Sequence, residues 1–156
     1  MPPINPPRRL HSADNFAAVH ALLTASFASM DGVIDPPSSL HAMTAETLRA
    51  QAESAEFWVI DPGPLACVIL TPQPDTLYLG KLAVTASHQG KGLARQLVSL
   101  AVQRAQVLGL PSVTLQTRIE LTDNHAAFQR LGFVEVARTA HKGYTRPTAI
   151  TYRRAT

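Results

Sequence analysis

One stretch of the sequence, from Leu77 to Leu108, constrains the fold of this chain more than any other. It opens with an apolar run ending at Val84, which predicts a strand. A polar loop follows and leads into Gln89-Gly-Lys-Gly-Leu-Ala94. Beyond that segment, apolar residues recur three or four positions apart, which predicts an amphipathic helix ending near Gly109. A strand, a glycine loop and a helix therefore follow one another directly.

This succession predicts an anion site. The first N–H groups of a helix lack intrahelical acceptors and lie at the positive end of the helix dipole. Gly90 and Gly92 have no side chain that would keep an anion away from these amides.

Two well-known phosphate motifs do not fit the loop. A P-loop requires a Ser or Thr after its lysine and wider glycine spacing, whereas Lys91 stands between two close glycines. A dinucleotide fingerprint requires three spaced glycines and an acidic residue at the end of the next strand, where residues 112–119 are followed only by Glu120. Another phosphorylated ligand, such as a nucleotide, stays open as an alternative.

Hydrophobic periodicity and turn residues predict the other elements on both sides of this stretch. Ser12 or Asp14 is expected to cap the first helix, Thr44 the second, and Thr122 or Asp123 the last. The loop 30–39 and His41 are candidates for substrate contact, because loops carry specificity. The expected elements are strand 4–10, helices to about 28 and over 45–53, strands 57–60, 65–70 and 76–84, the central helix, strand 112–119, helix 124–131, and strands 133–138 and 148–153.

Composition excludes several classes of protein. With 46% apolar and 16% charged residues the chain is globular, and its charge of +3 is not concentrated as in a nucleic-acid binder. The single cysteine, Cys67, allows no disulfide or cysteine metal cluster, and the six histidines form no metal-ligand pattern. No run approaches the roughly 18 apolar residues of a membrane span, and no signal-peptide pattern opens the sequence, so the cytoplasm is the expected location.

Two motifs together resemble the GNAT N-acetyltransferase family. The first is Leu82-Ala-Val84 followed by Gln89 to Ala94, which has the pattern Gln-x-x-Gly-x-Ala. The second is Phe128-Gln-Arg-Leu-Gly-Phe133, which is similar to the family's Tyr-x-x-x-Gly-Phe signature. The resemblance implies an α+β fold in one domain over residues 1–156: a central mixed, mostly antiparallel sheet of about seven strands, split near its middle and flanked by about four helices.

The resemblance also implies a function and a site. The expected reaction transfers an acetyl group from acetyl-CoA to a primary amine of a small molecule or peptide, by direct attack in a ternary complex. The backbone of Val84 and its two predecessors would hold the pantetheine arm and the acetyl carbonyl, and the glycine loop would wrap the pyrophosphate. The implied cofactor-binding residues are Leu82, Ala83, Val84, Gln89, Gly90, Lys91, Gly92, Leu93, Ala94, Arg95, Asn124, Phe128 and Arg130.

The sequence departs from the family at one catalytic position. Phe128 stands where the family often has a tyrosine that gives a proton to the departing thiolate, and a phenyl ring has no proton to give. Tyr144 is a candidate replacement; Glu120, His125 and His41 are candidates for the general base. A CoA-binding sensor without turnover is therefore the alternative function. Amino acids, polyamines, aminoglycosides, peptide N-termini and protein lysines all stay open as acceptors, and a homodimer is possible.

Overall fold

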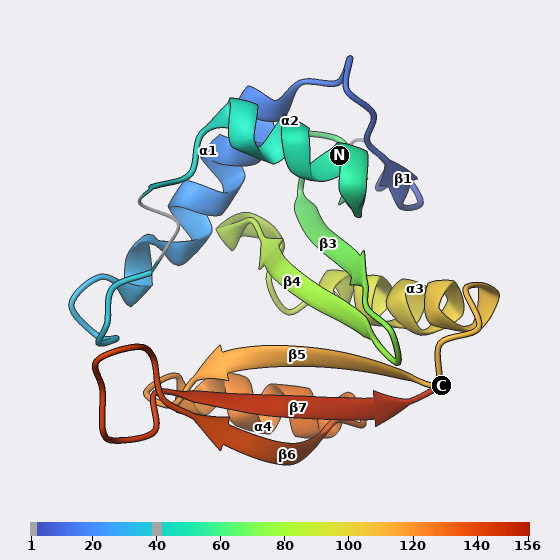
Figure 1. Ribbon diagram of the computed structural model, residues 1–156. Coiled ribbons are helices and arrows are strands. Elements are labelled where there is room, and N and C mark those ends of the chain that lie inside the picture. The colour runs from blue at the N-terminus through green and yellow to red at the C-terminus, as the bar shows by residue number, and fades with distance from the viewer. Residues whose placement is uncertain (1–2, 39–41) are drawn as a thin grey trace.

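A computed structural model describes residues 3–38 and 42–156. Within them the chain forms a seven-stranded sheet in the order β1-β2-β3-β4-β5-β7-β6, in which β4 and β5 are parallel and every other neighbouring pair is antiparallel (Figure 1). The strands are β1 (Arg8–Arg9), β2 (Glu56–Ile60), β3 (Ala66–Pro72), β4 (Leu77–Val84), β5 (Ser112–Arg118), β6 (Val134–Thr139) and β7 (Ala149–Ala155). This is the mixed, mostly antiparallel sheet predicted from the sequence.

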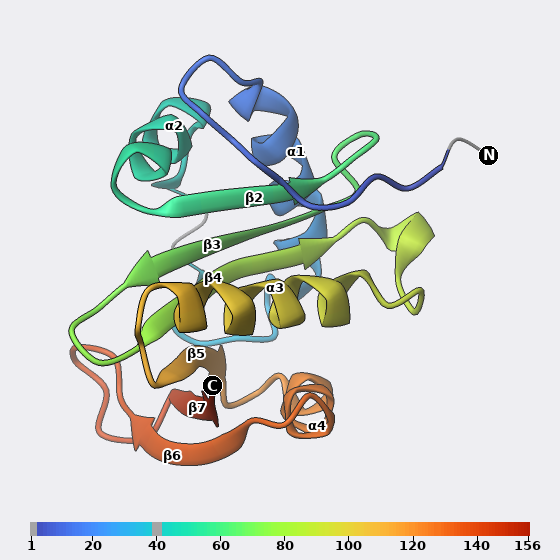
Figure 2. The same ribbon diagram turned by 90° about the vertical axis from the view of Figure 1, so that its right-hand side faces the viewer.

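Helices cover both faces of this sheet. In the described residues they are α1 (Phe16–Phe27), α2 (Ala45–Ser54), α3 (Leu93–Val107) and α4 (Thr122–Arg130), with short 3₁₀ turns η1 (Ala28–Met30) and η3 (Ala86–His88). Figure 2 shows α3 running along β3 and β4, with α4 near β5 and β7, while α1 and α2 lie beyond the opposite face. The order of α-helices and strands agrees with the prediction.

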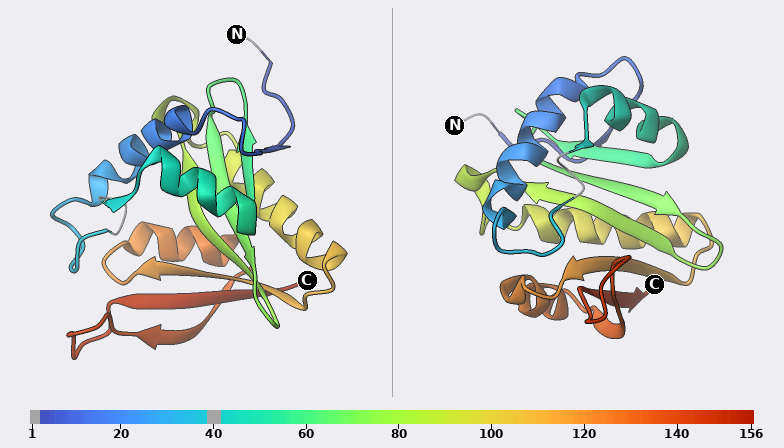
Figure 3. Two further views of the ribbon diagram at one scale, coloured as in Figure 1. Left: turned by 45° about the horizontal axis from the view of Figure 1, so that its top comes forward. Right: turned by 60° about the vertical axis from the view of Figure 1, so that its left-hand side comes forward.

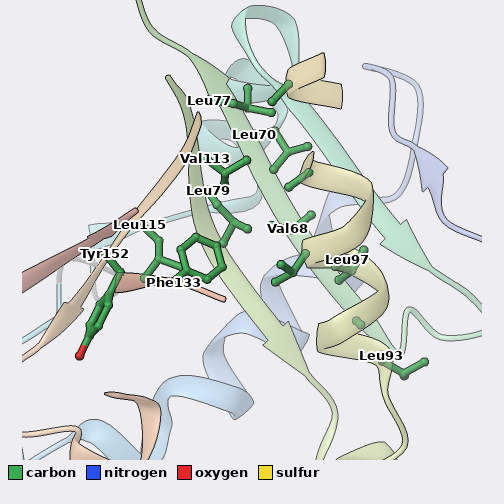
Figure 4. Close-up of a cluster of buried hydrophobic side chains, with 14 of the residues drawn as sticks. Val68, Leu70, Leu77, Leu79, Leu93, Leu97, Val113, Leu115, Phe133 and Tyr152 are labelled. Atoms are coloured by element: carbon green, nitrogen blue, oxygen red, sulfur yellow. The ribbon is translucent and has the colours of Figure 1, made fainter. Parts of the chain in front are cut away.

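The coverage of both faces explains why the central strands are continuously apolar. Along β3, Val68 and Leu70 belong to the core cluster under α3, whereas Cys67 and Ile69 belong to the cluster under α1 and α2. Side chains alternate between the faces of a strand, so a strand covered on both faces buries every residue. Figure 4 shows the α3 cluster, in which Leu97 faces residues of β3, β4 and β5.

Helix starts differ in detail from the prediction. Asn15, not Ser12 or Asp14, caps α1 through its side chain, because the Asp14 carboxylate accepts the His11 N–H and pairs with Arg8. At α4 the cap position is Leu121, without a side-chain bond, instead of Thr122 or Asp123. The predicted capping box of α2 is confirmed: the side chains and backbone N–H groups of Thr44 and Thr47 bond reciprocally.

Two further expectations concern the N-terminal part. The first strand is shorter than the predicted 4–10, because only Arg8 and Arg9 pair with β2. His41 lies outside the described residues. In the part of the chain that the structure describes, no helix has the length and apolarity needed to cross a bilayer, and no three side chains of the metal-ligating types gather.

The sheet opens between its two central strands. The pairing of β4 with β5 is limited to Leu77–Val113 and Tyr78–Thr114, after which the strands diverge (Figure 3, left). The loop after α1 and the loop between β6 and β7 lie side by side at the open end (Figure 1). This opening is where the predicted site residues gather.

Candidate active site

A bulge in β4 accompanies the opening. Between Cys67 and Ile69 the register of β3 against β4 shifts, and Lys81, near the shift, has a left-handed backbone with φ 51°. Positive φ is rare for residues other than glycine, and a bulge bends the strand that carries it. The bend agrees with the divergence of β4 from β5 just beyond Tyr78.

Two cavities meet at the divergence. The strand cavity, of about 300 Å³, lies between β4 and β5 and beside the end of α1. The glycine-loop cavity, of about 780 Å³, lies along the end of β4, the start of α3 and one side of α4. Leu82, Asn124 and Phe128 line both, so the two cavities adjoin at these residues. Such a pair of adjoining cavities has room for two reactants that meet at β4.

The glycine-loop cavity collects the predicted cofactor-binding residues, Lys91 excepted. The Lys91 residue is exposed and does not line it. His88, which the prediction did not include, also lines the cavity. The predicted residues that line it are Leu82, Ala83, Val84, Gln89, Gly90, Gly92, Leu93, Ala94, Arg95, Asn124, Phe128 and Arg130.

The start of α3 is open to an anion. Gly92, with φ 84°, precedes the helix, and its carbonyl accepts the first intrahelical bond from the Gln96 N–H at 3.0 Å. Gly90 is also left-handed, and a Cβ at either glycine would meet nothing within 4 Å. The amides before Gln96 are therefore free of intrahelical acceptors and unobstructed by side chains. The first turn holds no acidic residue, so nothing there opposes negative charge.

The second sequence motif closes α4 and places Phe128. Gly132, with φ 91°, donates its N–H to the Gln129 carbonyl, and the Phe133 N–H bonds the Phe128 carbonyl at 3.1 Å. This is the Schellman arrangement, and the edge-on contact between Phe128 and Phe133, with ring centroids 6.1 Å apart, is its usual hydrophobic partner. The Gly-Phe pair thus fixes the ring of Phe128 at the junction of the cavities.

The strand cavity has three ionisable side chains that the sequence analysis did not select. Lys81 comes from β4, Arg118 from the end of β5, and His141 from the β6–β7 loop. Tyr78 also lines the cavity, and burial raises the pKa of its hydroxyl. Only the fold brings these segments together, so no local pattern could have identified them.

His141 is held in place by β7. Its Nδ1 hydrogen-bonds the Thr148 hydroxyl, which also accepts the His141 backbone N–H at 2.9 Å. Burial, followed by the positive charge of Arg118, lowers the pKa of the imidazole, while Glu120 acts in the opposite direction. The lowered pKa favours the neutral imidazole of His141 at neutral pH. With its proton on Nδ1, the other ring nitrogen has a free lone pair.

Tyr144 and Glu120 do not line either cavity. The Tyr144 hydroxyl donates to Asp35 Oδ1 at 2.5 Å, and this bond raises its pKa. Glu120 Oε2 accepts the Asp35 N–H at 2.9 Å, while its Oε1 is buried and has no hydrogen-bond partner among the described residues. Arg146 pairs with the other Asp35 oxygen at 2.9 Å. Both predicted residues thus contact the loop after α1.

Two further residues with reactive side chains, His125 and Cys67, have contacts that argue against a catalytic role. The His125 Nε2 lies 3.1 Å from the Arg118 carbonyl, and its ring packs near Tyr152, away from both cavities. Cys67 is buried, and burial raises the pKa of its thiol to about 12. The thiol donates to the Lys81 carbonyl at 3.5 Å, so it stays protonated and is not a nucleophile.

Comparisons with known proteins agree with this geometry. The profile of the acetyltransferase (GNAT) family matches residues 16–133. The chain is 26% identical to N-alpha-acetyltransferase 30 of Saccharomyces cerevisiae over 80 residues, covering 48% of this chain and 46% of the yeast protein. The matched part thus spans just under half the length of that relative.

Solved structures resemble the chain over nearly its whole length. The ribosomal-protein-S18-alanine N-acetyltransferase of Escherichia coli superposes with a TM-score of 0.73 at 18% identity, covering 97% of this chain and 93% of the other. A GNAT family acetyltransferase of Elizabethkingia anophelis with acetyl-CoA bound gives a TM-score of 0.69 at 15% identity, covering 98% of both chains. At these identities the likeness establishes the fold.

Proposed function

The chain belongs to the acetyltransferase (GNAT) family, and on that premise we propose that it transfers an acetyl group from acetyl-CoA to a primary amine of an acceptor. The observation that carries the proposal is the junction of the two cavities at Leu82, Asn124 and Phe128. One cavity has the features of an anion site and the other is separate enough to hold an amine. The proposed mechanism is direct attack within a ternary complex, which two adjoining cavities support, since proximity and orientation supply much of such a rate.

The residues of the glycine-loop cavity fit acetyl-CoA. The free amides at the start of α3 suit a pyrophosphate, and Gly90 and Gly92 let it approach the backbone closely. Arg95 and Arg130 line the same cavity, and no Asp or Glu does. Acetyl-CoA, when bound, supplies the acetyl thioester. The Elizabethkingia anophelis structure with acetyl-CoA bound supports this assignment.

The end of β4 would orient the reacting carbonyl. Beyond Tyr78 the strand has no β5 partner, so an extended ligand arm has a free edge to pair with. The Val84 carbonyl already accepts from Gln89 Nε2 at 3.3 Å, which secures the loop to the strand. Backbone amides of Leu82 to Val84 are the proposed donors to the developing oxyanion.

We assign the general base to His141. The imidazole lines the strand cavity, has a lowered pKa that favours its neutral form, and is oriented by Thr148. It would accept the proton of the attacking amine directly or through one water. Phe128 carries no proton donor at the junction, so solvent is the proposed proton source for the leaving group. Tyr144 stays a second possibility for that role, with Asp35 holding its hydroxyl proton.

The absence of a hydroxyl on Phe128 also favours one other function, a CoA-binding sensor. A sensor would bind acetyl-CoA and leave the thioester intact with every amine offered. Thiol release in the presence of an acceptor separates the two functions.

The test of the cofactor site is acetyl-CoA binding by calorimetry to the natural sequence, Gly92→Asp and Gly92→Asn. Both substitutions place an equally large side chain on a backbone with φ 84°, which Asn and Asp tolerate better than other residues. They differ only in charge, so Gly92→Asn is the matched control. We expect Gly92→Asp to bind at least about tenfold more weakly than Gly92→Asn, equivalent to about 1.4 kcal/mol, with unchanged circular dichroism.

Equal affinities of the two variants for acetyl-CoA would show that the amides of the glycine loop do not bind its pyrophosphate. No binding to the natural sequence would overturn the proposed cofactor.

A further inference from the structure

The charged groups of the strand cavity define a class of acceptor. We infer that the acceptor is a small amine that also carries an anionic group, with an apolar α-amino acid as the model compound. The inference rests on the proposed function, because it names the substrate of the same site. It follows from the two cationic lining residues, Lys81 and Arg118, and from the absence of any Asp or Glu among the described residues that line the cavity.

Lys81 supplies a cation without a partner. It is partly buried, and in residues 3–38 and 42–156 no carboxylate forms an ion pair with it. Burial lowers the pKa of the lysine, and the Cys67 group, whose thiol is neutral, acts in the opposite direction. A buried charge normally has a paired opposite charge. A ligand anion would supply that pair here.

Arg118 supplies a second cation at the same wall. Its guanidinium donates to the carbonyls of Pro36 at 2.7 Å and Pro37 at 3.1 Å, which fixes its position without neutralising it. Several N–H groups of the fork stay available for a carboxylate.

The acidic groups nearest this wall are engaged elsewhere. Asp35 bonds Arg146 and Tyr144, and Glu120 accepts the Asp35 N–H, and neither carboxylate lines the cavity. Asp31 does not line the strand cavity; it lines a neighbouring cavity that shares Phe27 and Ser38 with it. A polyamine or aminoglycoside would therefore place its extra positive charges beside Lys81 and Arg118 with no carboxylate in the described lining of the same cavity.

Size and polarity narrow the class further. The volume of about 300 Å³ is at the lower end of the range usual for small-molecule sites. Met30, Leu115 and Leu121 give the cavity lining an apolar part beside the polar groups. An amino acid with an apolar side chain matches both features.

The experiment measures thiol release from acetyl-CoA by the full chain with matched acceptors. Leucine, methionine and phenylalanine are each compared with their carboxamides, and spermidine serves as the polycation. The carboxamides have less basic amines, so more of each is in the reactive neutral form, and a preference for the free acids cannot come from amine basicity. We expect kcat/KM for the acids to be at least about tenfold higher, as a hydrogen-bonded charge pair would give.

Variants of Lys81 test whether this residue causes the preference for free amino acids over their carboxamides. Lys81→Gln should raise KM for the acids about tenfold or more while leaving the carboxamides and acetyl-CoA unchanged. Lys81→Arg should restore the preference, and Lys142→Gln, the same charge change on an exposed loop, should alter nothing. Lys81→Asn is the second variant if Lys81→Gln does not fold, because Asn accepts a positive φ.

If kcat/KM for the carboxamides or for spermidine equals that for the free acids, the inferred acceptor class is wrong. The proposed acetyltransferase function would be unaffected by that result. An equal effect of Lys81→Gln on acids and carboxamides would overturn the inferred acceptor class as well. If no amine of either charge, including a short peptide N-terminus, releases thiol, the proposed function fails and the inference fails with it.

Discussion

The contact between Glu56 and Arg104 should stabilise the fold strongly, because it ties α3 to the sheet through a buried carboxylate. Glu56 on β2 is 5% exposed, and Arg104 binds both of its oxygens, at 2.7 and 2.8 Å. Trp58 adds a third bond at 3.0 Å. Arg104→Met would leave the carboxylate buried with one neutral donor.

Arg104→Met should lower the free energy of unfolding by about 2–3 kcal/mol at pH 7. This is just under the 3–5 kcal/mol typical of a broken buried ion pair, because the Arg104 side chain is 26% exposed. For a chain of this length the loss corresponds to a decrease in Tm of about 4–12 °C. Urea unfolding followed by the fluorescence of Trp58, the single tryptophan, measures it directly. Arg95→Met, the same substitution at an exposed position of the same helix, should change stability by less than about 0.5 kcal/mol.

The pH dependence checks the cause. Burial alone would raise the pKa of Glu56, but the bonds from Arg104 and Trp58 outweigh burial and lower it. A lowered folded-state pKa contributes stability above the unfolded value of about 4.3, which is lost as pH falls through the folded value. Without Arg104, burial favours a raised pKa of the Glu56 carboxyl, so the stability difference between the natural protein and Arg104→Met should narrow as the pH falls from the higher folded-state pKa of the variant to the lowered one of the natural protein. A difference that is constant with pH, or no larger than that of Arg95→Met, would refute the reasoning.

Three other residues give simpler tests. Since burial and Arg118 lower the pKa of His141, the acid limb of kcat/KM should have its midpoint below the ordinary histidine value of about 6.5, and His141→Gln should remove that limb and reduce kcat about 100-fold or more. A limb that survives would contradict the assignment. Thr44→Ala should cost about 1 kcal/mol in urea unfolding through loss of the capping box, unlike Thr145→Ala in an exposed loop. Cys67, with its pKa near 12, should resist iodoacetamide at pH 8 when folded and react in urea; alkylation of the native state at the rate of a free thiol would disprove its burial.

The elements and the glycine loop could be predicted because their signals are local. The helical period of α3, Gly92 before it and Gly109 after it each reflect geometry within a few residues. The capping box at Thr44 is a local signal of the same kind. Helix starts are harder to predict because several cap residues compete: the Asp14 carboxylate pairs with Arg8 and accepts the His11 N–H, and Asn15 caps α1 instead.

The strand cavity could not be predicted, because its polar groups meet only through long-range contacts. Gly80 inside the strand is a signal for a bulge, but a lysine at the next position does not indicate a left-handed residue, since glycine or asparagine is the usual signal for one. Arg118 is fixed by Pro36 and Pro37, more than 80 positions away along the chain. His141 follows an exposed edge strand and has no motif of its own.

The two halves of the site therefore depend on different parts of the chain. The glycine-loop cavity is formed mostly by one continuous stretch, from β4 into α3, and its fit to an anion needs backbone amides more than particular side chains. The strand cavity takes Lys81, Arg118 and His141 from three separate segments, and each can change without altering the loop. Substitutions in the strand cavity should thus change the choice of acceptor while acetyl-CoA binding is retained, which the paired calorimetry and thiol-release assays resolve.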